Sequence, residues 1–344
     1  MAAVLLFINQ GTAQNGFFDL LNAGEKDASK YAGLYVAPIF KGFGYGFNTG
    51  WYTTAKPHKT LGLDISLSAS LAYVPSSDQY FTFKNSDYSS LQLANGTEAK
   101  TPTLFGPNQP GPDVKVVDHN TTFGDVTLAD FSAPKGAGLK KEIGFNAVPT
   151  PVLQLGIGLI KNTDLKIRYV PDFSSSADYT MWGIGLMHDI TQWIPVVDKL
   201  PIDISIFGCY SNLKVNWPMS ANDTNFPGSN QALSTGIKAY SIEALISKKV
   251  SVLTVYAGIG YSKAKTYFNV LGTYELTYNP TTPPPVGYTL PTPVFTDPIS
   301  VNTKNGGMKL TAGLRLQFAI LTLHADYSLM GYNVLNTGIG FTFR

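Results

Sequence analysis

The sequence predicts an all-β protein: a closed antiparallel transmembrane barrel with lipid outside and a wet interior. Three observations support this prediction. Many segments alternate strictly between apolar and polar residues, charged residues are scarce, and the connections between strands are long at one end and short at the other. Successive side chains of a strand point to opposite sides of a sheet, so strict alternation gives each strand one apolar and one polar face.

The last 37 residues show this alternation in three consecutive strands. In the middle strand, the apolar residues Leu321, Leu323, Ala325, Tyr327 and Leu329 alternate with Thr322, His324, Asp326 and Ser328. Arg315, in the preceding strand, also occupies the polar face. Ion pairing alone does not explain an arginine, a histidine and an aspartate on one side of a sheet, whereas an enclosed wet lumen does.

Composition agrees with a lipid-facing surface and excludes several classes of function. Charged residues make up 14 % of the chain, against roughly 25 % in soluble domains. The net charge is +2 and no Lys/Arg-rich run occurs, so no electrostatic case exists for nucleic-acid binding. The single cysteine, Cys209, excludes an internal disulfide and a cysteine-rich metal site. We expect no cofactor and no metal.

The N-terminus predicts export. No run of about 18 apolar residues occurs, which excludes transmembrane helices. A short apolar stretch, residues 2–8, precedes small residues at positions 11–14 that suit a signal-peptidase site. We interpret residues 1–14 as the remnant of a signal peptide that starts upstream of Met1; the alternative is a disordered hydrophobic N-terminus.

Residues 15–50 differ from the rest and predict an N-terminal helix and a luminal plug. Ala28, Tyr31, Ala32 and Tyr35 have the spacing of an amphipathic helix, with Asp27 as its N-cap and Pro38 at its end. Then Phe43, Tyr45 and Phe47 alternate with Gly42, Gly44 and Gly46. Glycines allow close backbone approach, so this stretch is either a first strand against a crowded wall or a plug. The aromatic residues either line an apolar route or only pack the plug against the wall.

Residues 51–344 predict the barrel itself. Apolar residues alternate without a break from Leu61 to Tyr73, which is long enough to cross a bilayer. The long connections 74–149, 217–231 and 279–306 fall at one end and tight turns at the other, as in outer-membrane barrels. Ten strands are clear. Weak signals at 80–83 and 126–131, the stretch 41–51 and a divided 251–278 raise the total to about fourteen, with 10–12 as the alternative.

Several stretches carry a resemblance to a known family. The terminal strand Gly340-Phe341-Thr342-Phe343-Arg344 resembles that of Gram-negative outer-membrane barrels. The segments 42–52, 55–62 and 188–195, in a frame covering nearly the whole chain, resemble the FadL-type hydrophobic-compound channels and an uncharacterised FadL-related family of outer-membrane proteins. The Asn-Pro-Ala hatch signature of FadL-type channels is absent, so no ligand residue is transferred from them.

The resemblance implies a passive channel in the outer membrane that takes a hydrophobic small molecule from the long loops into a plugged lumen. The molecule leaves when the plug shifts or through a gap in the wall. An alternative function is a scaffold or docking partner for secretion or surface-protein assembly, with a protein partner bound through extracellular loops. No Gly-x-Ser-x-Gly elbow, metal-ligand helix or phosphate loop is present, which predicts a non-enzyme. Seven residues are candidates for lining the lumen or binding a ligand: Phe43, Tyr45, Phe47, Arg168, Arg315, His324 and Asp326.

Overall fold

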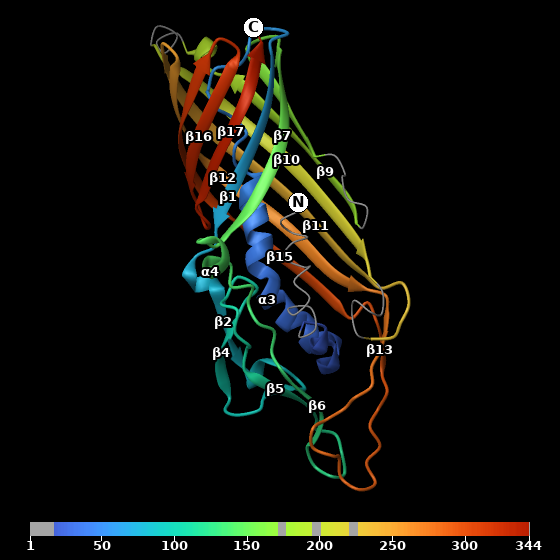
Figure 1. Ribbon diagram of the computed structural model, residues 1–344. Coiled ribbons are helices and arrows are strands. Elements are labelled where there is room, and N and C mark those ends of the chain that lie inside the picture. The colour runs from blue at the N-terminus through green and yellow to red at the C-terminus, as the bar shows by residue number, and fades with distance from the viewer. Residues whose placement is uncertain (1–16, 171–176, 195–200, 220–225, 344) are drawn as a thin grey trace.

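The computed structural model describes residues 17–170, 177–194, 201–219 and 226–343, and it shows a closed β-barrel within them. The predicted signal-peptide remnant lies outside the described residues. Ten antiparallel strands close in the order β1-β17-β16-β15-β12-β11-β10-β9-β8-β7 (Figure 1). Their bounds are β1 Leu63–Tyr73, β7 Ala147–Leu159, β8 Thr163–Val170, β9 Asp178–Asp189, β10 Asp203–Pro218, β11 Ala232–Val250, β12 Leu253–Leu271, β15 Ile299–Phe318, β16 Leu321–Leu329 and β17 Val334–Phe343.

The predicted count of about fourteen strands is wrong, and the observed ten falls within the alternative of 10–12. Residues 41–51 form no strand, and residues 251–278 contribute only β12 to the barrel, because the second strand there, β13, pairs with β14 in a separate sheet. The weak signals at 80–83 and 126–131 do form strands, but these belong to small sheets outside the barrel. Local sequence indicates that a segment is extended, whereas the choice of its partner depends on long-range contacts.

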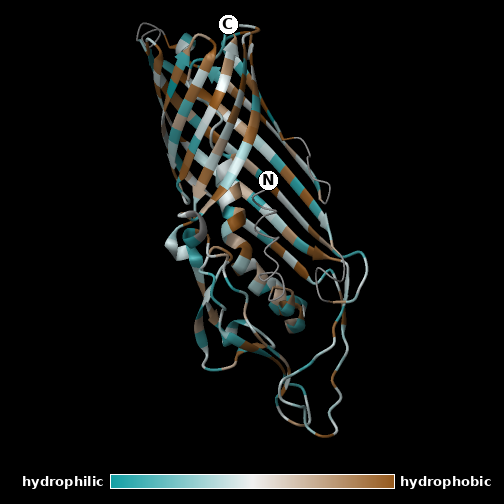
Figure 2. Ribbon diagram, viewed as in Figure 1, coloured by the Kyte–Doolittle hydropathy of each residue, from teal (hydrophilic) through white to brown (hydrophobic). Residues whose placement is uncertain are grey.

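The predicted sidedness of the strands is confirmed. Apolar residues on the outward face are solvent-accessible, such as Leu67 at 57 % and Ile242 at 63 %. The polar residues between them, such as Ser70 and Ser241, are buried inside. Figure 2 shows the resulting alternation of hydrophobic and hydrophilic residues along each strand. An apolar belt around the outside of a barrel indicates a lipid environment, since soluble monomeric proteins rarely expose large contiguous apolar surfaces.

The N-terminal segment enters the barrel as one long helix. The short 3-10 helix η1 (Asp19–Ala23) leads into α3 (Gly24–Phe47), which runs from the end with the long loops into the lumen (Figure 1). The prediction that Pro38 ends the helix is wrong, because Pro38 lies inside α3. A proline costs one intrahelical hydrogen bond, but here the packing of α3 against the wall holds the helix together beyond it.

The strands are unequal in length, and the longest ones support α3. β11, β12 and β15 have 19 or 20 residues and extend past the others at the long-loop end, where α3 contacts all three. The other end of the barrel has tight turns and is called the short-turn end here. It also holds the last described residues of the chain (Figure 1).

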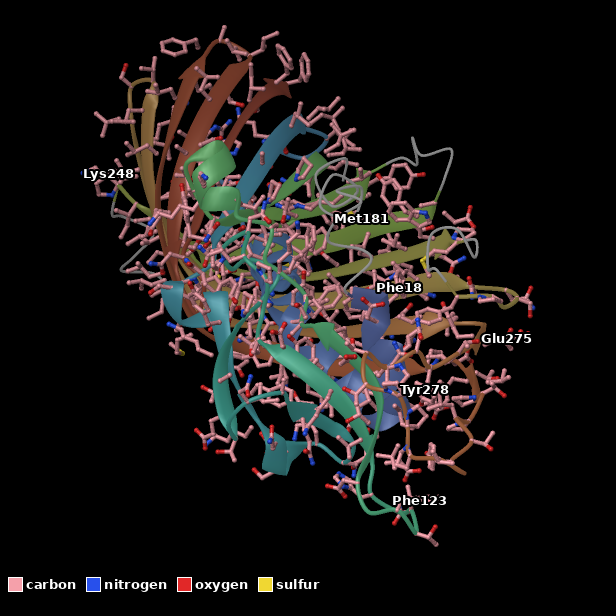
Figure 3. All side chains as sticks on the ribbon, turned by 60° about the horizontal axis from the view of Figure 1, so that its bottom comes forward. Phe18, Phe123, Met181, Lys248, Glu275 and Tyr278 are labelled. Carbon is pink, nitrogen blue, oxygen red and sulfur yellow. The ribbon has the colours of Figure 1, made fainter. Side chains whose placement is uncertain are left out.

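The long connection between β1 and β7 folds into a lobe at the long-loop end. One of its two small sheets pairs β2 with β4, and the other has the order β3-β5-β6. The loop between β12 and β15 holds a third sheet and reaches to the distal tip, where Phe123 of the lobe lies (Figure 3). The elements of the loops are η2 Ser76–Gln79, β2 Tyr80–Lys84, η3 Asn85–Asp87, β3 Leu91–Leu93, β4 Glu98–Pro102, β5 Asp113–Asp118, β6 Val126–Ser132, α4 Leu139–Ile143, η4 Thr191–Trp193, β13 Thr273–Glu275 and β14 Val294–Thr296.

The lobe holds the start of α3 through a buried carboxylate. Asp27, predicted as the N-cap of the helix, does not cap it. Its side chain instead accepts backbone hydrogen bonds from Ser89, Ser90 and Leu91 at 2.7–3.0 Å. A carboxylate that satisfies several backbone N–H groups fixes the position of the segment that carries them. The lobe and the plug therefore form one connected unit.

Candidate functional site: the plugged lumen

The C-terminal half of α3 is clamped between opposite walls of the barrel. A Cβ atom on Gly42 would lie 2.3 Å from a methyl carbon of Val148, on β7. On the other side of the helix, a Cβ on Gly44 would lie 2.7 Å from Cβ of Ala264, on β12. Only glycine permits approaches this close. The alternating glycines thus let the helix fit across the lumen.

The three aromatic residues between these glycines do not form a single stripe. In a helix, residues four apart share a face and residues two apart do not. Phe43 and Phe47 accordingly stack with ring centroids 6.1 Å apart, while Tyr45 points elsewhere and packs on Tyr332 at 5.4 Å. All three aromatic side chains are buried. The predicted stripe had the period of a strand, and the helix replaces it with two separate contacts.

Beyond α3, residues 48–58 form an irregular segment of turns and bends that leads through the lumen toward the short-turn end; they are called the strap here. Arg168 on β8, one of the predicted lumen residues, is fully buried and holds the end of the strap that follows α3. It donates hydrogen bonds to the carbonyl oxygens of Phe47 at 3.3 Å and Thr49 at 2.9 Å. Its guanidinium also lies 3.8 Å from the ring centroid of Trp51, a cation–π contact.

A buried ion pair holds the strap on the opposite wall. Lys309 Nζ lies 2.8 Å from Glu243 Oε1 and donates a 2.6 Å hydrogen bond to the carbonyl oxygen of Asn48. Tyr52 donates to the other carboxylate oxygen of Glu243 at 2.6 Å. Lys309 and Glu243 are 1 % and 2 % exposed. Sequence analysis did not single out this pair, although both residues occupy inward positions in alternating strands.

Glycines on the wall receive the aromatic residues of the strap. Trp51 lies against Gly183 and Gly185 on β9, where added Cβ atoms would come within 3.0 Å of its ring. Tyr52 lies against Gly258 on β12, with its hydroxyl 2.3 Å from where a Cβ would be. These glycines were visible in the sequence as inward positions. Only the tertiary structure shows that each one makes room for a plug side chain.

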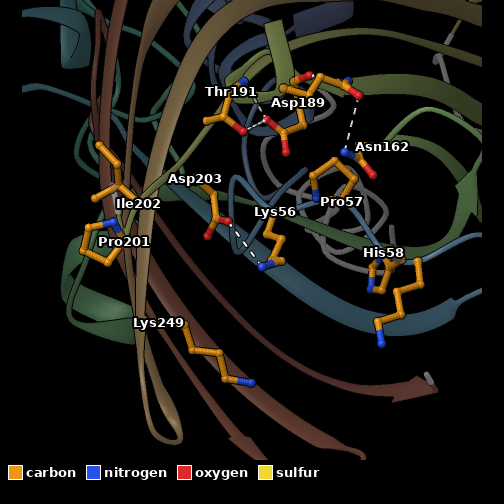
Figure 4. Close-up of a pocket in the computed structure, with 12 residues that line it drawn as sticks. Lys56, Pro57, His58, Asn162, Asp189, Thr191, Pro201, Ile202, Asp203 and Lys249 are labelled. Carbon is orange, nitrogen blue, oxygen red and sulfur yellow. Dashed lines mark hydrogen bonds and ion pairs between the residues drawn. The ribbon is translucent and has the colours of Figure 1, made fainter. Parts of the chain in front are cut away.

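The end of the strap farthest from α3 is fixed beside a cavity at the short-turn end. His58 donates its backbone N–H to Asp164 at 2.8 Å, and its ring Nδ1 lies 2.9 Å from the same carboxylate. The neighbouring cavity has a volume of about 480 Å³ (Figure 4). Lys56 lies 3.5 Å from Asp203 there, and Lys249 is another lining residue. Mixed charges line this cavity, so it favours no single ionic ligand.

The remaining predicted lumen residues lie together on β15 and β16. Arg315 and His324 are directly opposite each other, and Arg315 donates to the Thr342 hydroxyl at 3.0 Å. Asp326 accepts a 2.8 Å hydrogen bond from Asn336. Through Asn336 and Ser70, a chain of hydrogen bonds connects Asp326 to Thr49 of the strap. Of this group, Asp326 thus contacts the strap network, while Arg315 and His324 pack beside it.

The described residues contain no cluster of three or more His, Cys, Asp or Glu side chains that could hold a metal ion. Their helices are also too short or too polar to cross a membrane.

Comparison of the sequence with family models gives a match over residues 1–343. The chain belongs to DUF6588, a family of unknown function. No curated protein matches this DUF6588 chain.

Several solved structures are similar to the DUF6588 barrel at low identity. The attachment invasion locus protein Ail of Yersinia pestis is 9 % identical over 83 % of this chain and 98 % of its own, with a TM-score of 0.26. The translocator domain of autotransporter NalP from Neisseria meningitidis is 13 % identical over 83 % and 90 %, with a TM-score of 0.28. The monoaromatic hydrocarbon channel CymD is 11 % identical over 94 % and 98 %, with a TM-score of 0.18. The closed barrel is established by its own strand pairing.

Proposed function

We propose that the protein is an outer-membrane barrel that acts as a passive, non-enzymatic channel for small hydrophobic molecules, as its resemblance to FadL-type channels implies. The observation that carries the proposal is an apolar patch inside the polar lumen, which lies next to a strand edge with no partner among the described residues. The plug covers this patch.

Placement in the outer membrane rests on the outer surface of the barrel. Aromatic residues with exposed side chains lie near both ends of the apolar belt, as expected where strands leave the hydrocarbon region. Tyr240 and Tyr261 lie toward the long-loop end and are 38 % and 46 % exposed. Phe318 and Phe341, at the short-turn end, are 50 % and 44 % exposed. Between these levels the outward side chains are aliphatic.

The unpaired edge belongs to β7. Among the described residues, β8 pairs with β7 only from Leu153 to Leu159, so residues 147–152 pair with β1 alone. Even-numbered residues of this segment bond toward β1, as the hydrogen bond from Val74 to the carbonyl of Asn146 shows. The odd-numbered residues Pro149 and Pro151 therefore face the unpaired edge. Proline has no N–H group, so this edge presents fewer unsatisfied donors.

Apolar side chains line the inner side of the wall at this edge. Val148 and Val152 on β7 belong to the same buried cluster as Met181 on β9. Phe43 and Phe47 of α3 belong to it too. We propose that a hydrophobic solute leaves the lumen here, where no described strand would have to give up ladder hydrogen bonds. Because α3 packs against Val148 through Gly42, the helix must move before such a solute can pass.

The experiment locks the plug to the wall with a disulfide. Thr49 Oγ1 of the strap and Ser70 Oγ of β1 are 2.9 Å apart, so T49C/S70C in a C209A background gives two thiols within bonding reach. We expect oxidation to reduce uptake of a hydrophobic fluorescent probe into vesicles, and reductant to restore it. Both single-cysteine variants serve as controls. Equal uptake by the oxidised and reduced forms would refute a channel gated by the plug.

Docking of a protein partner is a second candidate, and the packing of the loop tips favours it. Tyr288 of the β12–β15 loop donates to Asp118 at 2.9 Å and packs edge-on against Phe123. Beside this contact Val286 is 99 % exposed, which is unusual for an apolar residue in a packed loop. A photo-crosslinking residue at Val286 tests the idea in intact cells. A single crosslinked partner that is absent for a control position at Glu98 would support docking, and no crosslinked product would argue against it.

A further inference from the structure

We propose that a row of lysines on the outside of the barrel binds the phosphate groups of an anionic glycolipid headgroup in the outer leaflet of the membrane. The row consists of Lys214, Lys238, Lys263, Lys265 and Lys304 and is called the lysine row here. The inference rests on the proposed placement in the outer membrane and is independent of transport.

Strand register brings these lysines together from distant parts of the chain. Lys238 on β11 is directly opposite Lys265 on β12, and Lys265 is directly opposite Lys304 on β15. Directly opposite residues have Cβ atoms about 5 Å apart. Lys263 lies one outward position along β12 from Lys265, and Lys214 is on the adjacent strand β10. Five positive charges thus occupy one patch of the outer surface.

No ion pair within the described part of the chain neutralises this patch, although Asp178 lies on the outward face of the neighbouring strand β9, opposite Asn216. The side chains of the lysine row make no ion pair and no hydrogen bond within the described residues, and all but the half-buried Lys263 are exposed. The four strands that carry the row are described throughout and contain two acidic residues, Asp203 and Glu243. Glu243 points into the lumen, and Asp203 bonds to the strap residue Lys56. The outward face of these strands therefore carries no negative charge.

Three like charges in direct cross-strand positions destabilise a sheet on their own. By contrast, the inward-facing Lys309 on β15 is paired with Glu243. The unpaired arrangement is explained if a polyanion supplies the missing charge from outside. Lysine binds phosphate as a flexible point charge, so several lysines suit a ligand with more than one phosphate group.

The height of the lysine row matches the headgroup layer. Lys263 and Lys265 lie two and four residues beyond Tyr261 toward the long-loop end of β12. With a rise of about 3.3 Å per residue and a strand tilt of about 40°, they lie about 5 and 10 Å above the tyrosine. Tyrosines of this kind mark the boundary of the hydrocarbon region. Lys238 lies two residues beyond Tyr240 on β11 in the same way.

The surface beside the lysines leaves space for a headgroup. Gly306 on β15 is directly opposite Lys263, so no side chain stands between that lysine and its neighbours on β15. A Cβ atom on Gly306 would lie 2.8 Å from Cα of Lys263. Bare backbone here lets a bulky sugar phosphate approach the ammonium groups closely.

The experiment compares two triple variants in detergent micelles. K238Q/K265Q/K304Q removes the centre of the lysine row, whereas K161Q/K248Q/K249Q removes the same charge from the short-turn end. Native mass spectrometry measures the affinity of each variant for bis-phosphorylated lipid A and for lipid A with both phosphates removed. We expect the first variant to bind bis-phosphorylated lipid A roughly ten- to a hundredfold more weakly than the unsubstituted protein. The control variant should bind it unchanged, and dephosphorylated lipid A should bind weakly to all three proteins.

Other results would overturn the proposal. Equal losses in both triple variants would indicate attraction by net charge alone. Equal binding of dephosphorylated lipid A would indicate recognition of acyl chains, and competition by millimolar inorganic phosphate would indicate a free-anion site. Folding is checked in neutral detergent, where K238Q/K265Q/K304Q should be at least as heat-stable as the unsubstituted protein because repulsion is removed. Transport is measured separately by the disulfide experiment, so failure of one proposal leaves the other intact.

Discussion

Replacing Lys309 by methionine tests whether the buried ion pair holds the strap in the lumen. The substitution preserves the length of the side chain and removes its charge. Glu243 would keep the hydroxyl donors of Tyr52 and Ser241, at 2.6 and 2.9 Å, but would lose its cation. The carbonyl oxygen of Asn48 would lose its 2.6 Å donor.

The magnitude follows from burial. Removing one partner of a buried ion pair costs about 3–5 kcal/mol, and the two remaining hydrogen bonds to Glu243 favour the lower end of that range. Leaving the Asn48 carbonyl without its donor adds about 1 kcal/mol. We therefore expect K309M to lower the free energy of unfolding by about 4 kcal/mol. In the double variant K309M/E243M, only Tyr52, Ser241 and Asn48 lose partners, and the loss should shrink to about 1–3 kcal/mol.

Equilibrium urea unfolding in detergent micelles measures these values, and limited proteolysis between residues 48 and 58 reports whether the strap is released. A loss below about 1 kcal/mol for K309M would refute the argument, since a lysine that is truly desolvated against Glu243 cannot be removed so cheaply. A double variant that is less stable than K309M would refute it as well, because the cost would then not come from the uncompensated carboxylate.

Three further predictions test other parts of the structure. Leu323→Arg places a charge on the lipid-facing side of β16, where Leu323 is 40 % exposed, and should cost about 2–4 kcal/mol of stability near the midplane. His324→Gln, on the inward side, should cost less than about 1 kcal/mol. Equal costs for the two variants in urea unfolding would mean that the assigned sidedness is wrong. Gly46→Val should displace α3, because its Cβ would lie 2.2 Å from Thr150 Oγ1. In the control Gly208→Ala, the added Cβ meets nothing closer than 3.8 Å. Proteolysis of α3 should therefore rise in the first variant alone, and the second substitution T150G should reverse the effect of Gly46→Val. Acid should loosen the lobe from α3, because Asp78 of the lobe is held by Lys41 and Tyr332. Partial burial of Asp78 favours its neutral form, but the contacts with Lys41 and Tyr332 outweigh burial and hold the pKa of Asp78 below its ordinary value of 3.8. A carboxyl with a depressed pKa contributes stability above its unfolded-state pKa and loses it as the pH falls through the folded-state pKa. Protease sensitivity of the lobe should therefore rise below about pH 4, and Asp78→Asn should remove that pH dependence.

The structure also argues against one substitution that the sequence alone would suggest as an inward control. His324 lies on a wet face in the sequence, so an arginine there looks harmless. In the barrel its cross-strand neighbour is Arg315, and two cations directly opposite each other are destabilising. Polarity of a face is a local property, whereas the charge of the residue across the ladder depends on register. Glutamine is therefore the proper inward control.

The sequence by itself determined which side of each strand meets lipid, because a period of two residues is fixed within a single segment. Leu323 and His324 were assigned to opposite faces before any partner strand was known. Composition and the contrast between long and short connections were then enough to predict that these strands close into a barrel. The candidates on those strands, Arg168 and Asp326, were recognised from polarity as inward-facing.

Only the tertiary structure decided how many strands close the barrel and what fills it. The stretch around Phe43 alternates like a strand, yet it is helical, because inside the lumen a helix satisfies its own backbone groups while its glycines fit against both walls. Lys238, Lys265 and Lys304 are far apart in the chain, and the register of three strands makes them neighbours. Local pattern fixes the faces of a strand, but partners, occupancy of the lumen and clusters of charge arise from contacts between residues distant in sequence.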